Sequence, residues 1–221
     1  MASAHTATVD RYLEAIYCIA AEGEVVRPGR LAYWLSVSPP TVSNALQRLR
    51  RDGWVELETD RSVSLTPSGE STATALVRRH RILERWLTDV LGLDWASADV
   101  EAERLASSIS EEVIERIDHS MGSPATCPHG NVIPGRVAPY GALVALADLG
   151  AGTAAVVRRI SEVAEHEAPT LLTTLAAHAI GEGTPLTPVG AGEDGSLTLR
   201  VADRTFDLDR AAAASVWVEV V

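Results

Sequence analysis

The segment Ser38–Glu70 reads SPPTVSNALQRLRRDGWVELETDRSVSLTPSGE. Its first part, from about Pro39 to Arg51, predicts a helix, because its apolar residues recur at helical spacing. Those residues are Val42, Leu46 and Leu49. Ser38 is a favourable N-cap, and proline is tolerated in a first helical turn. Asp52-Gly53 then ends the predicted helix.

A β-hairpin is predicted directly after this helix. The runs 54–58 and 62–66 are strand-like, and residues 59–61 join them. Upstream, residues 8–21 form an amphipathic helical pattern, and residues 30–35 form a short second helix. Helix, helix, turn, helix and hairpin is the order of a winged helix-turn-helix.

In that arrangement the third helix enters the DNA major groove and the wing contacts the backbone. Thr41, Ser43 and Asn44 begin the third helix and can read base edges, whereas arginines suit phosphates. The predicted DNA-binding residues are Arg27, Ser38, Pro40, Thr41, Ser43, Asn44, Arg48, Arg51 and Arg61. The alternative is a structural three-helix unit whose arginines form a solvated face.

A second informative stretch is Arg78–Ser107, which contains two helical runs separated by a short break at residues 92–94. His80 and Glu84 lie four residues apart on the first run, and Asp99 and Glu103 lie four apart on the second. Residues four apart share one helix face, so two such pairs can converge on one divalent cation. The alternative is two solvated helices with ordinary surface acids.

Composition sets the class of the protein. With 221 residues, 46% hydrophobic and 22% charged, the chain is expected to fold around a substantial core. A net charge of −11 argues against indiscriminate coating of nucleic acid, but it leaves sequence-specific binding open. Without an apolar run of roughly 18 residues or a signal-peptide pattern, a cytoplasmic protein without membrane contact is expected.

The fold class predicted is mainly α with small β elements, in three domains. We expect a winged helix-turn-helix over residues 1–72 and a helical metal-binding and dimerisation domain over 73–140. The latter ends in a Pro/Gly-rich linker. Short strands and turn signals over 141–221 predict an SH3-like β-barrel. Its strands are expected at 154–160, 197–201, 205–208 and 216–221, with a helix over 168–179 and turns over 181–195.

Three runs resemble the diphtheria-toxin-repressor family of iron- and manganese-responsive regulators. They are the segment Ser38–Glu70, RRHRILERWLTDVLGLD at residues 78–94, and SEEVIERIDHSMGSPATCPHGNVIPG at residues 110–135. The wing with its TPSGE exit and the CPHGNVIPG segment are the most specific. The resemblance is continuous from residue 8 to residue 136 and weaker over the C-terminal part.

This resemblance implies a homodimeric transcriptional repressor of metal-homeostasis genes, not an enzyme. Such a repressor binds a palindromic double-stranded DNA operator when a divalent ion such as Mn²⁺ or Fe²⁺ is bound. The C-terminal domain would be of the SH3-like, FeoA-like kind. Glu111–Met121 resembles the dimerisation helix, with Val113, Ile114 and Ile117 as its apolar stripe.

The family's ancillary metal site is implied by His80 and Glu84, with Asp99 where the family usually has histidine. From the C-terminal domain, Glu167 aligns with a family ligand. Thr170 falls where glutamine is frequent, and His166 is an adjacent substitute.

The family's primary site is altered, because its four positions carry Arg11, Glu103, Ala106 and Ser107. Only Glu103 is a good ligand, and the permanent charge of Arg11 opposes a cation. Glu14 is a partial replacement, since manganese-responsive relatives use a glutamate there. The predicted metal ligands are therefore His80, Glu84, Asp99, Glu103, Glu14 and Glu167, an oxygen-rich set that favours Mn²⁺.

Alternatives remain at this stage. Arg11 could pair with Glu103 or Asp10 and mimic the bound cation, which gives a metal-independent regulator of the same fold, or one that responds to another ligand. A third class is an enzyme or metal-buffering protein without DNA binding. The segment Cys127-Pro128-His129-Gly130 is interpreted as a structural loop, since no second cysteine pair lies nearby.

Overall fold

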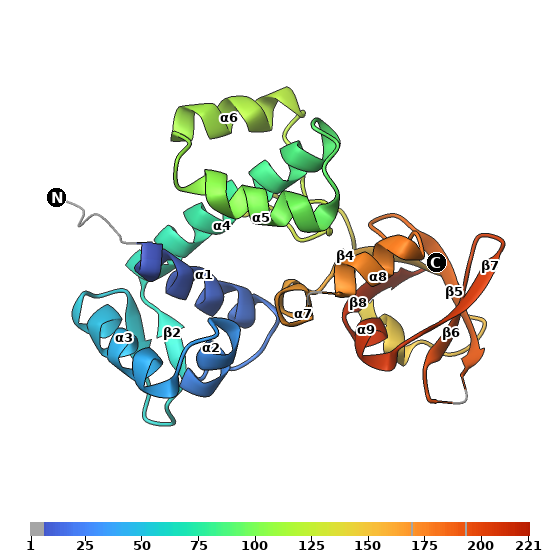
Figure 1. The fold of residues 1–221 in the computed structure, drawn as a ribbon, viewed down its shortest axis with the longest axis horizontal. Coiled ribbons are helices and arrows are strands. Elements are labelled where there is room, and N and C mark those ends of the chain that lie inside the picture. The colour runs from blue at the N-terminus through green and yellow to red at the C-terminus, as the bar shows by residue number, and fades with distance from the viewer. Residues whose placement is uncertain (1–6, 169, 193) are drawn as a thin grey trace.

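The computed structural model describes residues 7–168, 170–192 and 194–221 (Figure 1). Three bodies follow one another along the chain. The blue helices and wing lie at the lower left of Figure 1, the green helices α4–α6 at the top, and the orange-red sheet at the right. Each body has its own cluster of buried apolar side chains. The predicted fold class is confirmed, while the boundaries at residues 72 and 140 stay predictions.

The N-terminal body is a winged helix-turn-helix. Its helices are α1 (Ala7–Ala21), α2 (Pro28–Trp34) and α3 (Pro39–Arg51). The wing is the antiparallel pair β1 (Val55–Leu57) and β2 (Val63–Leu65). The Ser38 hydroxyl caps α3 by accepting a hydrogen bond from the Thr41 amide at 3.4 Å. The three apolar residues of α3 point inward and leave its polar face exposed, as the spacing predicts.

The middle body is built on the 23-residue helix α4 (Pro67–Asp89). Gly92, with φ of 72°, turns the chain into α5 (Trp95–Ala106), and α6 (Glu111–Ser120) follows. The apolar residues predicted to form one stripe on α6 differ in burial: Ile114 is fully buried, whereas Val113 is 43% exposed. An exposed valine beside a buried isoleucine leaves part of this helix open for a partner surface.

The C-terminal body is a six-stranded antiparallel sheet in the order β3-β8-β4-β5-β6-β7. Its strands are β3 (Val144–Ala145), β4 (Ala155–Ile160), β5 (Pro185–Ala191), β6 (Leu197–Val201), β7 (Arg204–Leu208) and β8 (Val216–Val220). Short helices connect them: η1 (Leu146–Asp148), α7 (Glu162–Glu167), α8 (Leu171–Ala177) and α9 (Arg210–Ala214).

One sequence-based expectation for this body is wrong, and another holds over a shorter range. Turns were expected over 181–195, but β5 runs through it from Pro185 to Ala191, with an irregularity between Pro188 and Gly190. Proline is compatible with a strand at its first residue and at a bulge, which is where these prolines lie. The helix expected over 168–179 is confirmed in a shorter form, because among the described residues of that range α8 runs from Leu171 to Ala177. The helix α7, which ends at Glu167 before this range, was not predicted.

Within the described ranges of the chain, none of the helices combines the length and the apolar character that crossing a bilayer requires.

Candidate metal centre and DNA interface

A cavity of about 220 Å³ lies where the three bodies meet. It is lined by ligand-capable side chains from α1, α4, α5, the loop after α6, and α7. They are Glu14, Cys18, His80, Glu84, Asp99, Glu103, Cys127, Glu162, Glu165 and His166. Arg11 of α1 also lines it. Residues separated by more than 150 positions therefore share one polar cavity.

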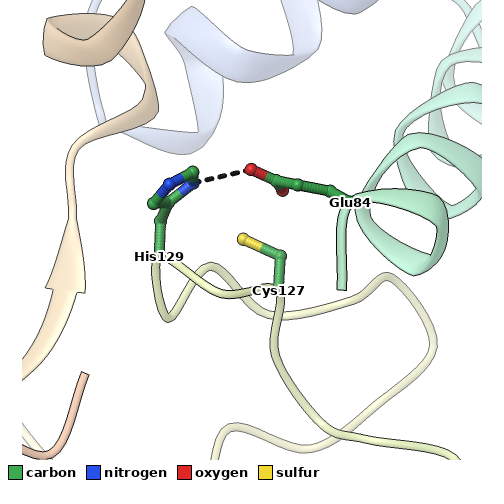
Figure 2. A group of neighbouring side chains, drawn as sticks. All are labelled: Glu84, Cys127 and His129. Atoms are coloured by element: carbon green, nitrogen blue, oxygen red, sulfur yellow. Dashed lines mark ion pairs between the residues drawn. The ribbon is translucent and has the colours of Figure 1, made fainter. Parts of the chain in front are cut away.

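Two buried residues that line this cavity, Glu84 and Cys127, form a group with the buried His129, which we call the inner cluster. Each offers one ligand atom, and these atoms lie within 4.8 Å of one another. Figure 2 shows the three side chains converging, with the Glu84 carboxylate 2.7 Å from His129 Nδ1. Glu165 of α7 adds a second carboxylate, 3.5 Å from the same nitrogen.

The loop that carries Cys127 and His129 is held by backbone hydrogen bonds. The Cys127 amide donates to the Asn131 carbonyl at 2.9 Å, and the Gly130 amide donates to the Cys127 carbonyl at 3.0 Å. The His129 carbonyl accepts from the Ile160 amide at 2.8 Å, so the loop is fixed to the end of β4. Gly130 has φ of 80°, a left-handed conformation that favours glycine. The tight turn aims both side chains at α4.

Charge dominates the inner cluster. Burial alone would raise the pKa of Glu84, but the neighbouring His129 outweighs it and brings that pKa down to about 2. Burial would lower the pKa of His129, yet Glu84 and Glu165 hold it well above its usual range. Burial raises the pKa of Glu165 well above normal. Two carboxyl groups therefore share one imidazole, and a metal ion could bind to this ring only after it loses its proton.

The outer cluster consists of His80, Glu84 and Asp99, whose ligand atoms also lie within 4.8 Å of one another. His80 Nε2 is 3.2 Å from an Asp99 oxygen. Burial would lower the pKa of His80, but Asp99 and Glu84 outweigh it and raise the pKa to about 9. Burial, above all other causes, raises the pKa of Glu14 to about 7. Glu84 belongs to both clusters.

The six predicted metal ligands do not all lie at the cavity. It brings His80, Glu84 and Asp99 together, and Glu14 and Glu103 line the same cavity. Glu167 is not among the lining residues; it forms an ion pair with Arg30 of α2. Within α7 it is Glu165, two positions earlier, that faces the cavity.

Sequence reasoning missed Cys127, His129 and Glu165 as candidate ligands. The segment 127–130 is indeed a tight loop, but the loop also presents a thiol and an imidazole to Glu84. A metal site was expected only with a second cysteine pair nearby in the sequence. In the structure, the neighbouring ligand-capable residues are the acids Glu84 of α4 and Glu165 of α7. The one sequence signal was two ligand-capable residues spaced two apart in a turn.

The donors present fit a divalent transition metal. His129 Nε2 and one Glu165 oxygen are buried and have no hydrogen-bond partner in the part of the chain that the structure describes. Buried polar atoms of this kind are rare in native proteins unless a water or an ion satisfies them. Imidazole, thiolate and carboxylate together suit borderline ions such as Fe²⁺, Zn²⁺ or Mn²⁺. Arg11 is exposed and also lines the cavity, but it is in neither cluster.

The exposed face of α3 carries the predicted base-reading residues. Thr41, Asn44 and Arg48 are exposed, whereas the hydroxyl of the equally exposed Ser43 donates to the Pro39 carbonyl at 3.0 Å. Ser38 and Pro40 lie at the exposed start of the same helix, and Ser38 also serves as its cap.

The arginines surround this face. Arg27 precedes α2 and donates to the Asp60 carbonyl of the wing at 2.8 Å, and Arg61 occupies the wing turn with φ of 67°. Arg51 is paired with Asp52 at 3.0 Å. Recognition helix and wing therefore present polar and basic groups on exposed positions, while the DNA contacts of individual residues stay predictions.

Comparison with known proteins identifies this arrangement. Residues 5–63 match the model of the iron-dependent repressor N-terminal DNA-binding domain. Residues 66–135 match the iron-dependent repressor metal-binding and dimerisation domain, and residues 144–220 match the FeoA domain. The chain is 39% identical over 166 residues to the iron-dependent repressor IdeR of Mycobacterium tuberculosis, which covers 70% of this chain and 72% of that protein. The chain belongs to the iron-dependent repressor family.

Other relatives of the chain support the same family assignment. The diphtheria toxin repressor of Corynebacterium diphtheriae is 41% identical over 128 residues, 58% of this chain and 57% of that protein. A solved manganese-dependent transcriptional repressor in complex with manganese superposes with a TM-score of 0.83 at 31% identity. That superposition covers 96% of this chain and all of the other. The protein is thus a metal-dependent, DNA-binding transcriptional repressor with a divalent metal cofactor, and it is not an enzyme.

Metal binding to this repressor is expected to strengthen as pH rises. His80, with its pKa of about 9, and His129, with its pKa well above normal, are protonated at pH 7 and must lose a proton to ligate. Each released proton changes affinity about tenfold per pH unit below the pKa. The affinity for Mn²⁺ measured by calorimetry should therefore rise at least about tenfold per unit between pH 6 and pH 8. A flat profile would show that these imidazoles do not ligate.

Proposed function

We propose that this repressor acts in the cytoplasm on genes of metal homeostasis. It binds a palindromic operator as a homodimer when a divalent metal occupies the cavity around Glu84. The observation that carries this proposal is the convergence of the inner and outer clusters on Glu84, at the meeting point of the DNA-binding, dimerisation and FeoA domains. A cation at that point can fix the domains relative to one another.

The ligands of the proposal differ in hardness between the two clusters. Glu84, Cys127, His129 and Glu165 would form a borderline site, because the thiolate favours Fe²⁺ or Zn²⁺ over harder ions. His80, Asp99, Glu14 and Glu103 would supply the oxygen-rich outer part, which suits Mn²⁺. The participation of Cys127 moves the preference toward Fe²⁺ relative to the oxygen-rich set predicted from sequence. Glu167 is supported less well than Glu165, because it is paired with Arg30.

On the DNA side, α3 would enter the major groove and its exposed Thr41, Ser43 and Asn44 would face base edges. Arg27, Arg48, Arg51 and Arg61 would contact phosphates, with Ser38 and Pro40 at the helix start against the backbone. The net charge of −11 makes this local concentration of arginine the part of the surface suited to DNA.

The position of Arg11 favours one second candidate, a regulator that needs no metal. Arg11 lines the same cavity as Glu14 and Glu103, where a permanent positive charge can replace a cation. The two candidates share the DNA interface and differ in a single measurable property, the dependence of operator affinity on metal.

The decisive experiment uses the full-length protein and a duplex selected from a random pool in the presence of Mn²⁺. Affinity for that duplex, measured by fluorescence anisotropy, should fall at least about tenfold when a chelator removes the metal, as typical allosteric couplings predict. Arg48→Ala is the control, and it should weaken binding with and without metal alike. Undiminished affinity in chelator would instead establish the metal-independent candidate.

A further inference from the structure

Helix α7 belongs to the C-terminal domain by sequence, yet most of its side chains contact the other two domains. Figure 1 shows it between the blue helices and the red sheet. Val163 is 5% exposed and is part of the apolar cluster of the winged helix-turn-helix. A single short helix is thereby inserted into the DNA-binding domain from a distant part of the chain.

One side of α7 faces the metal cavity. Glu165 lies 3.5 Å from His129, and Glu162 pairs with the buried Arg81 of α4 at 2.5 Å. Glu165 of α7 and Glu84 of α4 therefore place two carboxyl groups against the same imidazole ring. A divalent cation bound by both groups would join α7 to α4.

The last two residues of α7, His166 and Glu167, contact α2. The His166 ring stacks on the Trp34 ring at 4.4 Å with an angle of 8° between planes, and its Nε2 lies 2.6 Å from the Trp34 carbonyl. Glu167 forms an ion pair with Arg30. Trp34 is the last residue of α2, the helix that precedes the helix-turn-helix turn, so this contact bears on the placement of α3.

Resting on the proposed function, we propose that α7 transmits metal binding to the DNA-binding domain. Glu165 senses the cation, and His166 and Glu167 act as positioning residues that hold α2 through Trp34 and Arg30. Consecutive residues of one rigid turn cannot move independently, so fixing Glu165 fixes the residues beside it. Helix α1 also lines the cavity, where Glu14 and Cys18 can ligate and Arg11 cannot.

The test compares the full-length protein with the double variant His166→Ala, Glu167→Gln. The quantity measured is the metal activation ratio, the affinity for the selected duplex with Mn²⁺ divided by that in chelator. Loss of a stacked ring pair and its hydrogen bond should lower this ratio about tenfold. Mn²⁺ stoichiometry should be unchanged, because neither residue ligates in this proposal. Circular dichroism verifies that the variant is folded.

Two matched variants serve as controls for this comparison. Arg158→Gln removes an ion pair with Glu219 inside the C-terminal domain and should leave the ratio unchanged. His166→Phe keeps the ring on Trp34 and should retain more of the activation than the double variant does.

Three outcomes overturn the inference. A double variant with a wild-type activation ratio shows that α7 does not transmit the signal. A double variant that loses Mn²⁺ shows that His166 or Glu167 is a ligand and not a positioning residue. Wild-type protein without metal dependence overturns the proposed function itself, which the first two outcomes leave standing.

Discussion

Glu84→Gln is expected to abolish metal-dependent DNA binding. Glu84 is the one residue shared by the inner and outer clusters, so its neutralisation removes a charged oxygen ligand from both. Glutamine has nearly the same volume but no charge, and it leaves the shape of the cavity intact. Even outer-shell partners of metal ligands typically contribute 10–100-fold to affinity, so the Mn²⁺ affinity should fall by at least about 100-fold.

The measurement is competition with a chromophoric chelator, followed by operator binding at saturating Mn²⁺. Glu101→Gln is the matched control, because Glu101 lies on α5 and is paired with Arg104 outside both clusters. Glu84→Gln also removes the ion pair with His129, so thermal unfolding of the metal-free protein must show a folded variant. Mn²⁺ affinity within tenfold of wild type would contradict the placement of the metal at Glu84.

Gly130→Ala is expected to have the largest effect on stability. A Cβ at this position would lie 1.8 Å from the Arg158 carbonyl oxygen and 2.8 Å from its carbon, both backbone atoms that cannot turn aside. The backbone there has φ of 80°, which is strained for alanine as well. Strain and overpacking together should lower the free energy of unfolding by about 3–4 kcal/mol.

Gly135→Ala separates these two causes. Gly135 has φ of 86°, and nothing lies within 4 Å of an added Cβ. That variant should therefore show only the cost of a left-handed alanine, about 1–2 kcal/mol. Both are measured by urea denaturation with chelator present. Because Gly130 follows His129 and packs on β4, Gly130→Ala should also reduce Mn²⁺ stoichiometry, whereas Gly135→Ala should not. Equal effects of the two substitutions would refute the close contact with Arg158.

Local sequence patterns were sufficient to predict the fold of the winged helix-turn-helix. The periodicity of α3, its cap at Ser38 and the stop at Asp52-Gly53 depend on neighbours a few residues away, and the structure has the helix at Pro39–Arg51. The pairing of His80 with Glu84 on one helix face was predictable for the same reason. By contrast, β5 was missed because two prolines and a glycine disguise a strand that pairing with β4 and β6 stabilises.

The metal centre required the tertiary structure. Glu84 lies on α4, Cys127 and His129 on a later loop, and Glu165 on a helix of another domain, so no spacing along the chain relates them. Sequence alone determined which ligand-capable residues the chain contains, and its resemblance to the family predicted that Arg11, Ala106 and Ser107 weaken one site. Only the packing of three domains decided that Glu165, not Glu167, faces the cavity. The reason is that Glu167 finds its opposite charge on Arg30, while Glu165 is buried against His129.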